Sequence, residues 1–212
     1  MILFYSIIFG ILTSASQPAE TLPALPFIDE AGSDKSFYTA RESLLYALEE
    51  NDTSYVLSVF AHDVKLDFGG GYGVEELHRR LKGDNWSENL WSVLHTTLSL
   101  GGTFSGRDYF LAPYVYSTWP SEYDAYNKLA ITAKNVPVYE QPDTSQHIVT
   151  TLSYNIVGYD YRWHDRDWVR LKLPGNRIGY VKRAMTRSPI DYRIFFQKID
   201  GEWNITIFLA GD

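Results

Sequence analysis

The sequence predicts an α+β protein in which a small all-β unit is set beside, or inserted into, a domain of helices and strands. Three observations predict this fold class. Helical periodicity dominates residues 36–100, short β-type segments separated by turns fill residues 129–187, and an alternating hairpin pattern follows at residues 192–209. The chain has 212 residues, 45% of them apolar, which is enough to bury one large or two small cores.

The first residues are typical of an export signal. Ile2–Leu12 is almost continuously apolar and small residues follow it at 13–16, whereas a bilayer span needs about 20 apolar residues. We therefore expect a signal peptide at 1–16, no membrane span after its removal, and a periplasmic or secreted protein. No Lys or Arg precedes the run, so an uncleaved anchor and a buried first helix are the alternatives. The chain has no cysteine, which excludes disulfides, thiolate zinc sites and cysteine nucleophiles. It also excludes a lipoprotein, because acylation would need a cysteine after the cleavage site.

Residues 17–32 contain three prolines and few periodic apolar positions, which indicates an extended linker. An α+β domain is expected to follow at 33–128. Ser36–Glu50 has apolar residues at near-helical spacing, and Thr53–Phe60 is expected to form a short second helix.

The rest of this domain alternates between strand and helix signals. Val64–Phe68 alternates apolar and charged residues, as a half-buried strand does, and three glycines end it. Val74–Lys82 and Asn89–Leu100 carry helical patterns. Gly101–Pro120 is rich in aromatic residues and is expected to be a loop.

Five short strands are expected between residues 129 and 188, followed by a hairpin in 191–212. The expected strands are Lys134–Tyr139, His147–Leu152, Asn155–Tyr159, Trp168–Leu173 and Arg177–Val181. The hairpin joins Tyr192–Ile199 to Trp203–Leu209 across Asp-Gly, a dipeptide that suits a tight turn. Its apolar face needs a partner, and the strand at 64–68 is the natural candidate. On this interpretation the hairpin completes the first domain and the all-β unit is inserted into it.

Four motifs of the all-β unit resemble those of bacterial SH3-like (SH3b) domains. They are Asn135–Pro142, Val149–Leu152, Trp168–Leu171 and Gly179–Val181, in the order and spacing of that family. The resemblance implies a small barrel of five or six strands that binds peptidoglycan, peptides or a partner domain. Tyr139 stands where the family often has arginine, and Ser153 replaces a common turn glycine. The remaining residues resemble NTF2-like α+β domains more weakly, as a fold analogy.

Charge is divided unevenly along the chain. Residues 131–193 hold ten Lys/Arg and six Asp/Glu, a net charge of +4, whereas the rest of the chain has a net charge of −11. A basic module favours an anionic polymer such as cell-wall glycan, although scattered solvated charge is an equally good interpretation. No dense basic stripe is present, so nucleic acid is not expected as a partner.

Aromatic residues of the all-β unit are the best candidates for binding, because their faces stack on sugar rings and on peptide backbone. Two arginines nearby are suited to the carboxylates of a stem peptide. The alternative is that part of this set points into the core. The candidate binding residues are Tyr139, Tyr154, Tyr159, Tyr161, Arg162, Trp163, Arg166 and Tyr180.

No enzyme, cofactor or metal motif is present. The five histidines lack metal-ligand spacing and no serine-nucleophile elbow occurs. The sequence therefore favours a non-catalytic, extracytoplasmic binding or scaffold protein whose partner is a cell-wall polymer or a protein or peptide. The rival hypothesis places Asp67, His78 and His95 in a pocket of the α+β domain, as a general base and its orienter. Such a pocket would bind, hydrolyse or isomerise a small molecule.

Overall fold

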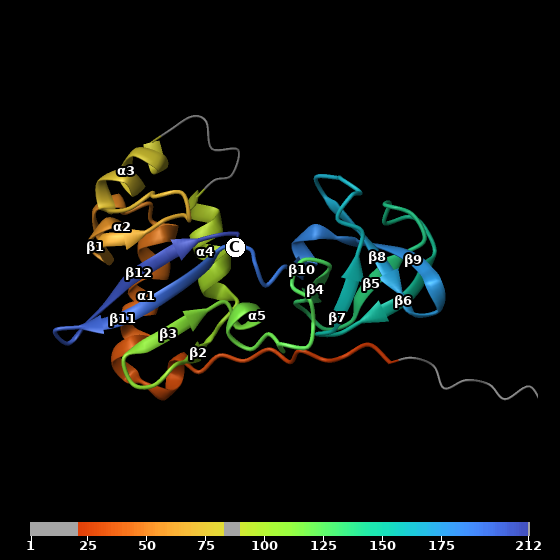
Figure 1. The fold of residues 1–212 in the computed structure, drawn as a ribbon, viewed down its shortest axis with the longest axis horizontal. Coiled ribbons are helices and arrows are strands. Elements are labelled where there is room, and N and C mark those ends of the chain that lie inside the picture. Colours follow the sequence, from red (N-terminus) through yellow and green to blue (C-terminus); the bar gives the residue numbers. More distant parts are fainter. Residues whose placement is uncertain (1–20, 83–89, 212) are drawn as a thin grey trace, which may run out of the picture.

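The computed structural model describes residues 21–82 and 90–211, which form two β-sheets with separate cores (Figure 1). The α+β class expected from the sequence is confirmed. The signal peptide expected at 1–16 lies outside the described residues, as do positions 17–20 of the expected linker.

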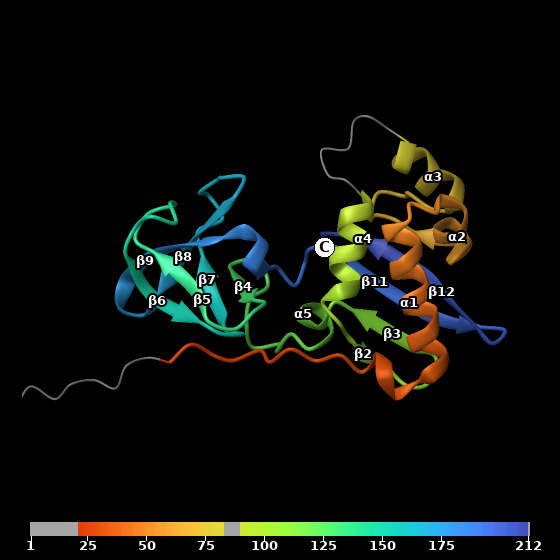
Figure 2. The same cartoon turned by 180° about the vertical axis from the view of Figure 1, so that it is seen from behind.

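The first sheet has five strands in the order β1-β12-β11-β3-β2. The strands are β1 (Phe60–Lys65), β2 (Thr103–Phe104), β3 (Tyr109–Ala112), β11 (Arg193–Ile199) and β12 (Glu202–Leu209). The helical elements are η1 (Ala31–Ser33), α1 (Lys35–Glu49), α2 (Thr53–Ser58), α3 (Val74–Lys82), α4 (Leu90–Ser99) and α5 (Tyr114–Ser117). Helices α1 and α4 cover one face of this sheet (Figure 2).

Aromatic side chains fill the space between α1 and the first sheet. The ring of Phe37 is fully buried and contacts Phe104, Phe110, Phe196 and Trp203, with centroid distances of 5.5, 4.1, 5.1 and 5.0 Å. Most of these contacts are edge-to-face, the geometry that aromatic pairs favour. The centre of this domain is therefore occupied by the protein's own rings.

The second sheet has seven strands in the order β10-β4-β7-β8-β9-β5-β6. The strands are β4 (Lys128–Ile131), β5 (Val136–Tyr139), β6 (Ile148–Leu152), β7 (Ile156–Tyr159), β8 (Trp168–Leu173), β9 (Arg177–Lys182) and β10 (Thr186–Arg187), with 3-10 turns η2 (Pro174–Asn176) and η3 (Arg183–Met185). Buried residues from β4 to β9 belong to a single cluster, so the sheet curves around one core.

The closed barrel expected from the sequence is not formed. β10 and β6 are the two edges of the second sheet and are not paired with each other. β10 has two residues and is paired with β4, which leaves little backbone for a further ladder. The unit is therefore an open, curved sheet.

The chain leaves the first sheet after α5, builds the second sheet and then returns as β11 and β12. These two strands form an antiparallel hairpin, and β12 also pairs in parallel with β1. The second sheet is thus an insertion between strands of the first, as Figure 1 shows.

Residues 21–30 form an extended segment, here called the N-terminal arm, that lies along both sheets (Figure 1). At the second sheet, the Leu25 amide donates to the Tyr154 carbonyl at 2.6 Å, and the Ile156 amide donates to the Pro23 carbonyl at 2.8 Å. The Leu25 side chain is buried in a small cluster between the two sheets.

The other end of the arm is held by the first domain. The Glu30 amide donates to the Gly102 carbonyl at 3.0 Å. Arg41 of α1 donates to both carboxylate oxygens of Asp29, at 2.7 and 2.8 Å. The segment that the sequence indicates as a linker at 17–32 is therefore, from residue 21 onward, a docked part of the fold, because its backbone and side chains find partners on both sheets.

Two expected elements differ in the structure. Gly101–Pro120, expected to be a loop, contains β2, β3 and α5, because its aromatic residues at 104 and 110 pack onto Phe37. The strand expected at Val64–Phe68 is β1, which begins at Phe60 and ends at Lys65. Its burial does not alternate regularly, since its register with β12 shifts along the pair.

Candidate functional site: an aromatic face on the second sheet

The core of the second sheet is aliphatic, so aromatic rings on neighbouring positions lie on its other face. Val138, Val169 and Val181 are buried in the core. Successive residues of a strand point to opposite faces, so the residues beside these valines, Tyr139 on β5, Trp168 on β8 and Tyr180 on β9, point outward. We call Tyr139, Trp163, Trp168, Tyr180 and Lys182 the outer aromatic face.

The members of the outer aromatic face contact one another. Tyr139 lies edge-on to Trp168 at 5.7 Å, and Trp163 lies edge-on to Tyr180 at 5.3 Å. Tyr139 and Tyr180 are direct partners across β5 and β9. The Lys182 ammonium is 4.1 Å from the centre of the Trp168 ring, within the range of a cation–π interaction.

Trp168 is not in the binding set predicted from the sequence. The sequence predicts its strand, and its position beside the buried Val169 is the signal that places it on the outer face. It is 6% exposed, because neighbouring side chains cover it. Tyr139, Trp163 and Tyr180 remain half-buried, so a ligand would contact these three rings first.

The loop at 160–167, which carries Trp163, is held in place by hydrogen bonds to its backbone. The Arg183 guanidinium donates to the carbonyl oxygens of Asp165, Trp168 and Arg166 at 2.8, 3.0 and 3.2 Å. The Asp165 carboxylate accepts the Trp168 amide at 3.0 Å. A loop ordered before binding loses less conformational entropy when a ligand arrives.

A cavity of about 300 Å³ adjoins this loop. Its lining residues are Leu129, Tyr159, Asp160, Tyr161, Trp163, His164, Val169, Arg183, Thr186, Ser188 and Asp191. The Tyr159 hydroxyl donates to the Tyr126 carbonyl at 3.1 Å, and burial raises the pKa of Tyr159 above its ordinary value. Trp163 belongs both to the lining of the cavity and to the outer aromatic face, so the two share this side chain.

The predicted binding residues are thus only partly brought together. Tyr139, Trp163 and Tyr180 share the outer aromatic face, and Tyr159, Tyr161 and Trp163 line the cavity. Tyr161 is 52% exposed.

The other three predicted residues have different positions. Tyr154 lies beside the N-terminal arm, where its carbonyl accepts the Leu25 amide. Arg162 is exposed, with its Nε donating to the Tyr161 hydroxyl at 3.3 Å. The exposed Arg166 contributes its carbonyl to Arg183. The two arginines are therefore at the surface of the loop, and Tyr154 belongs to the contact with the arm.

Two residues of the rival Asp/His pocket, Asp67 and His95, lie beside oppositely charged or ionisable side chains of neighbouring elements. The Asp67 carboxylate is paired with Arg80 of α3 and accepts the Gly71 amide at 2.8 Å. The Arg80 hydrogen bond and then the Gly71 amide lower the pKa of Asp67 to about 2, because both stabilise the ionised carboxylate. His95 is placed beside Glu49, with its Nε2 3.6 Å from a Glu49 carboxylate oxygen.

Within residues 21–82 and 90–211, no cluster of three or more histidine, aspartate or glutamate side chains is arranged to hold a metal ion. In the same residues, no helix has the length and apolar character needed to cross a bilayer.

The fold places a row of aromatic side chains on one face of an open β-sheet that is inserted into an α+β domain. Comparisons with protein-family models, with curated protein sequences and with solved structures found no match to this chain.

Proposed function

We propose that this protein is a non-catalytic, extracytoplasmic binding protein that holds peptidoglycan on the outer aromatic face and in the adjoining cavity of its second sheet. The observation that supports the proposal most is that the two faces of that sheet carry different kinds of side chain. Aliphatic side chains complete its core, and a row of rings with a lysine is left on the other side.

The chemistry of the face fits a glycan that carries peptide carboxylates. Half-buried rings stack on sugar rings and exclude water from the contact. Arg162 and Arg166 are exposed on the neighbouring loop, where a carboxylate can form a charge-assisted hydrogen bond with either guanidinium. The excess of basic residues in 131–193 would attract such an anionic polymer.

The first domain would act as the carrier. Its interior is filled by buried apolar side chains, the rings around Phe37 among them, and its Asp67 carboxylate is paired with Arg80. The N-terminal arm and the Leu25 cluster link the carrier to the second sheet, so the binding face has a defined support.

Co-sedimentation of the full chain with purified peptidoglycan at low salt tests this proposal. We expect the unsubstituted protein to pellet, and Trp163→Ala and Tyr180→Ala each to weaken binding by about tenfold or more, because central aromatic residues dominate such contacts. Tyr46→Ala is the matched control, since Tyr46 is 64% exposed on α1, outside this face. A protein that stays in the supernatant, or a Tyr46 variant that loses as much binding as the others, would overturn the proposal.

A further inference from the structure

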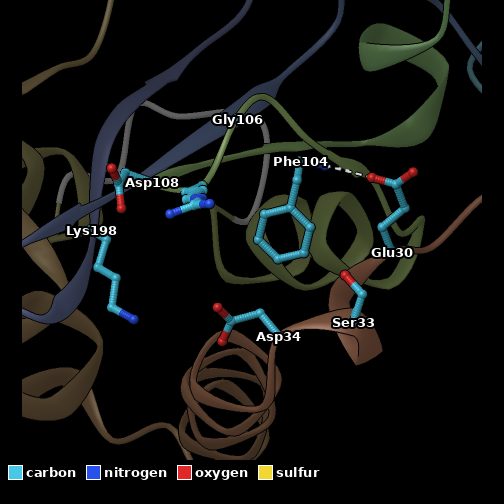
Figure 3. Close-up of a pocket in the computed structure, with 8 residues that line it drawn as sticks. Glu30, Ser33, Asp34, Phe104, Gly106, Asp108 and Lys198 are labelled. Carbon is cyan, nitrogen blue, oxygen red and sulfur yellow. Dashed lines mark hydrogen bonds between the residues drawn. The ribbon is translucent and has the colours of Figure 1, made fainter.

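A second cavity, of about 620 Å³, lies in the first domain, distant in the fold from the outer aromatic face. It forms where the β2–β3 turn, the start of α1 and the end of β11 meet (Figure 3). Its lining residues are Glu30, Ser33, Asp34, Phe104, Gly106, Arg107, Asp108 and Lys198.

The cavity contains cations that the protein leaves largely available. Arg107 has no ion pair or hydrogen-bond partner for its guanidinium within the described residues. The Lys198 ammonium donates to the Ser36 hydroxyl at 3.0 Å, which uses one of its three protons. Figure 3 shows the Lys198 ammonium and the Asp34 carboxylate both directed into the open space.

Two carboxylates of the cavity, those of Asp34 and Glu30, each accept hydrogen bonds through one of their two oxygens. One Asp34 oxygen, Oδ1, accepts the Ser36 and Phe37 amides at 2.7 and 3.0 Å and caps α1. Glu30 Oε2 accepts the Phe104 amide at 2.8 Å. In each case the second oxygen accepts no hydrogen bond from the residues that the structure describes. Because the first amides of α1 are already bonded to Asp34, the feature is a cavity with charges of both signs and not a bare helix end.

An apolar surface separates these charges. The Phe104 ring lies between Glu30 on one side and Asp34 and Lys198 on the other in Figure 3. Its edge-to-face contacts with Phe37 at 5.5 Å and Phe110 at 5.0 Å hold the ring in position. A short hydrocarbon chain could pack on this ring while its polar ends reach charges on either side.

We propose that this cavity binds an α-amino acid, free or at the end of a peptide, through its ammonium and carboxylate groups together. Arg107 and Lys198 receive the carboxylate, and Asp34, on the same side of the ring as Lys198, receives the α-ammonium group. The side chain lies on Phe104 with its far end towards Glu30. Three acidic residues face two basic ones in the lining, so a basic amino acid such as lysine is preferred over glutamate. This site is independent of the peptidoglycan proposal.

Isothermal titration of the full chain at low salt, with L-lysine, L-leucine, L-glutamate and the diamine cadaverine as probes, tests the proposal. We expect saturable binding of lysine, weaker binding of leucine and the weakest binding of glutamate. Cadaverine has two ammonium groups and no carboxylate, so we expect it to bind about tenfold or more weakly than lysine, through loss of one charge-assisted contact. Equal binding of lysine and cadaverine would reduce the site to cation attraction and overturn the proposal.

Two variants assign the binding to this cavity. Arg107→Gln and Asp108→Asn change exposed side chains of the β2–β3 turn, which lie outside the buried core, and each is expected to weaken lysine binding, Arg107→Gln by about tenfold. Arg177→Gln, an exposed arginine on β9 of the other sheet, is the matched control. Circular dichroism of all three variants verifies their folding. Absence of saturable lysine binding, or unchanged binding in both turn variants, would overturn the assignment.

Discussion

At the scale of single residues, the Asp67 carboxylate connects two elements of the first domain. It follows β1 and accepts the amides of Gly69 and Gly71, each at 2.8 Å, while Arg80 of α3 is paired with it. These donors stabilise the ionised form, so they hold its pKa at about 2 compared with an ordinary value of 3.8. The side chain therefore joins α3 to the end of β1.

This lowered pKa predicts how stability depends on pH. A carboxylate whose pKa falls on folding contributes stability above its unfolded pKa, and that contribution is lost as the pH falls towards the folded value. We expect the free energy of unfolding to decline from about pH 3.8 to about pH 2. Urea denaturation of the protein and of Asp67→Asn over this range measures it, and the variant should show a shallower decline. Identical slopes for the two proteins would contradict the assignment.

At the scale of elements, the N-terminal arm is the feature that ties the two sheets together. Its contact with the second sheet consists of a short backbone pairing and one buried side chain, Leu25, which is 4% exposed. Such a short extended segment cannot form a stable strand by itself, so its order depends on the surfaces that it contacts.

Leu25→Ala is expected to loosen the arm. Truncating a buried leucine costs about 2–5 kcal/mol, and here the loss falls on the docking of one segment. Amide hydrogen exchange at Leu25 and Ile156, whose amides bond across this contact, should become faster in the variant. Ile28→Ala, at a position that is 38% exposed, serves as the control and should leave exchange unchanged. Equal protection in the Leu25 variant and the parent would show that the side chain is not the anchor.

At the scale of the whole molecule, the basic segment of the sequence nearly coincides with the inserted sheet. Strands β5 to β10 of the inserted sheet lie within residues 131–193, which have a net charge of +4, and the remaining residues have a net charge of −11. An anionic ligand would therefore be attracted to the inserted sheet and repelled by the carrier, which orients its approach.

This division predicts that peptidoglycan binding depends on salt. Because exposed charges are screened over about 10 Å at 0.1 M ionic strength, raising the salt concentration should weaken retention severalfold. The double variant Arg162→Gln, Arg166→Gln should bind more weakly at low salt and respond less to added salt. Co-sedimentation over a salt series measures both effects, with Tyr46→Ala as the control. Salt-independent retention would mean that the charges of the loop do not take part.

Local patterns were sufficient for much of the fold. The Asp200-Gly201 turn with alternating apolar residues on both sides predicted the hairpin that is β11 and β12. Trp168–Leu173 was predicted with the boundaries of β8. Among the site residues, Tyr139, Trp163 and Tyr180 were predicted because they are aromatic positions of the all-β unit. Each of these features is encoded within a few neighbouring residues, since side-chain alternation and turn chemistry are local properties.

Other features of the fold depend on residues far apart in the sequence, and only the tertiary structure decided them. The parallel pairing of β1 with β12, the docking of Leu25 and the open edges of the second sheet each depend on which surfaces meet after folding. The same is true of the cavity beside Arg107 and Lys198, which belong to different strand connections. The sequence by itself determined which faces are apolar, aromatic or charged. Only the folded chain decided which of those faces cover one another, because burial results from contacts that no local pattern contains.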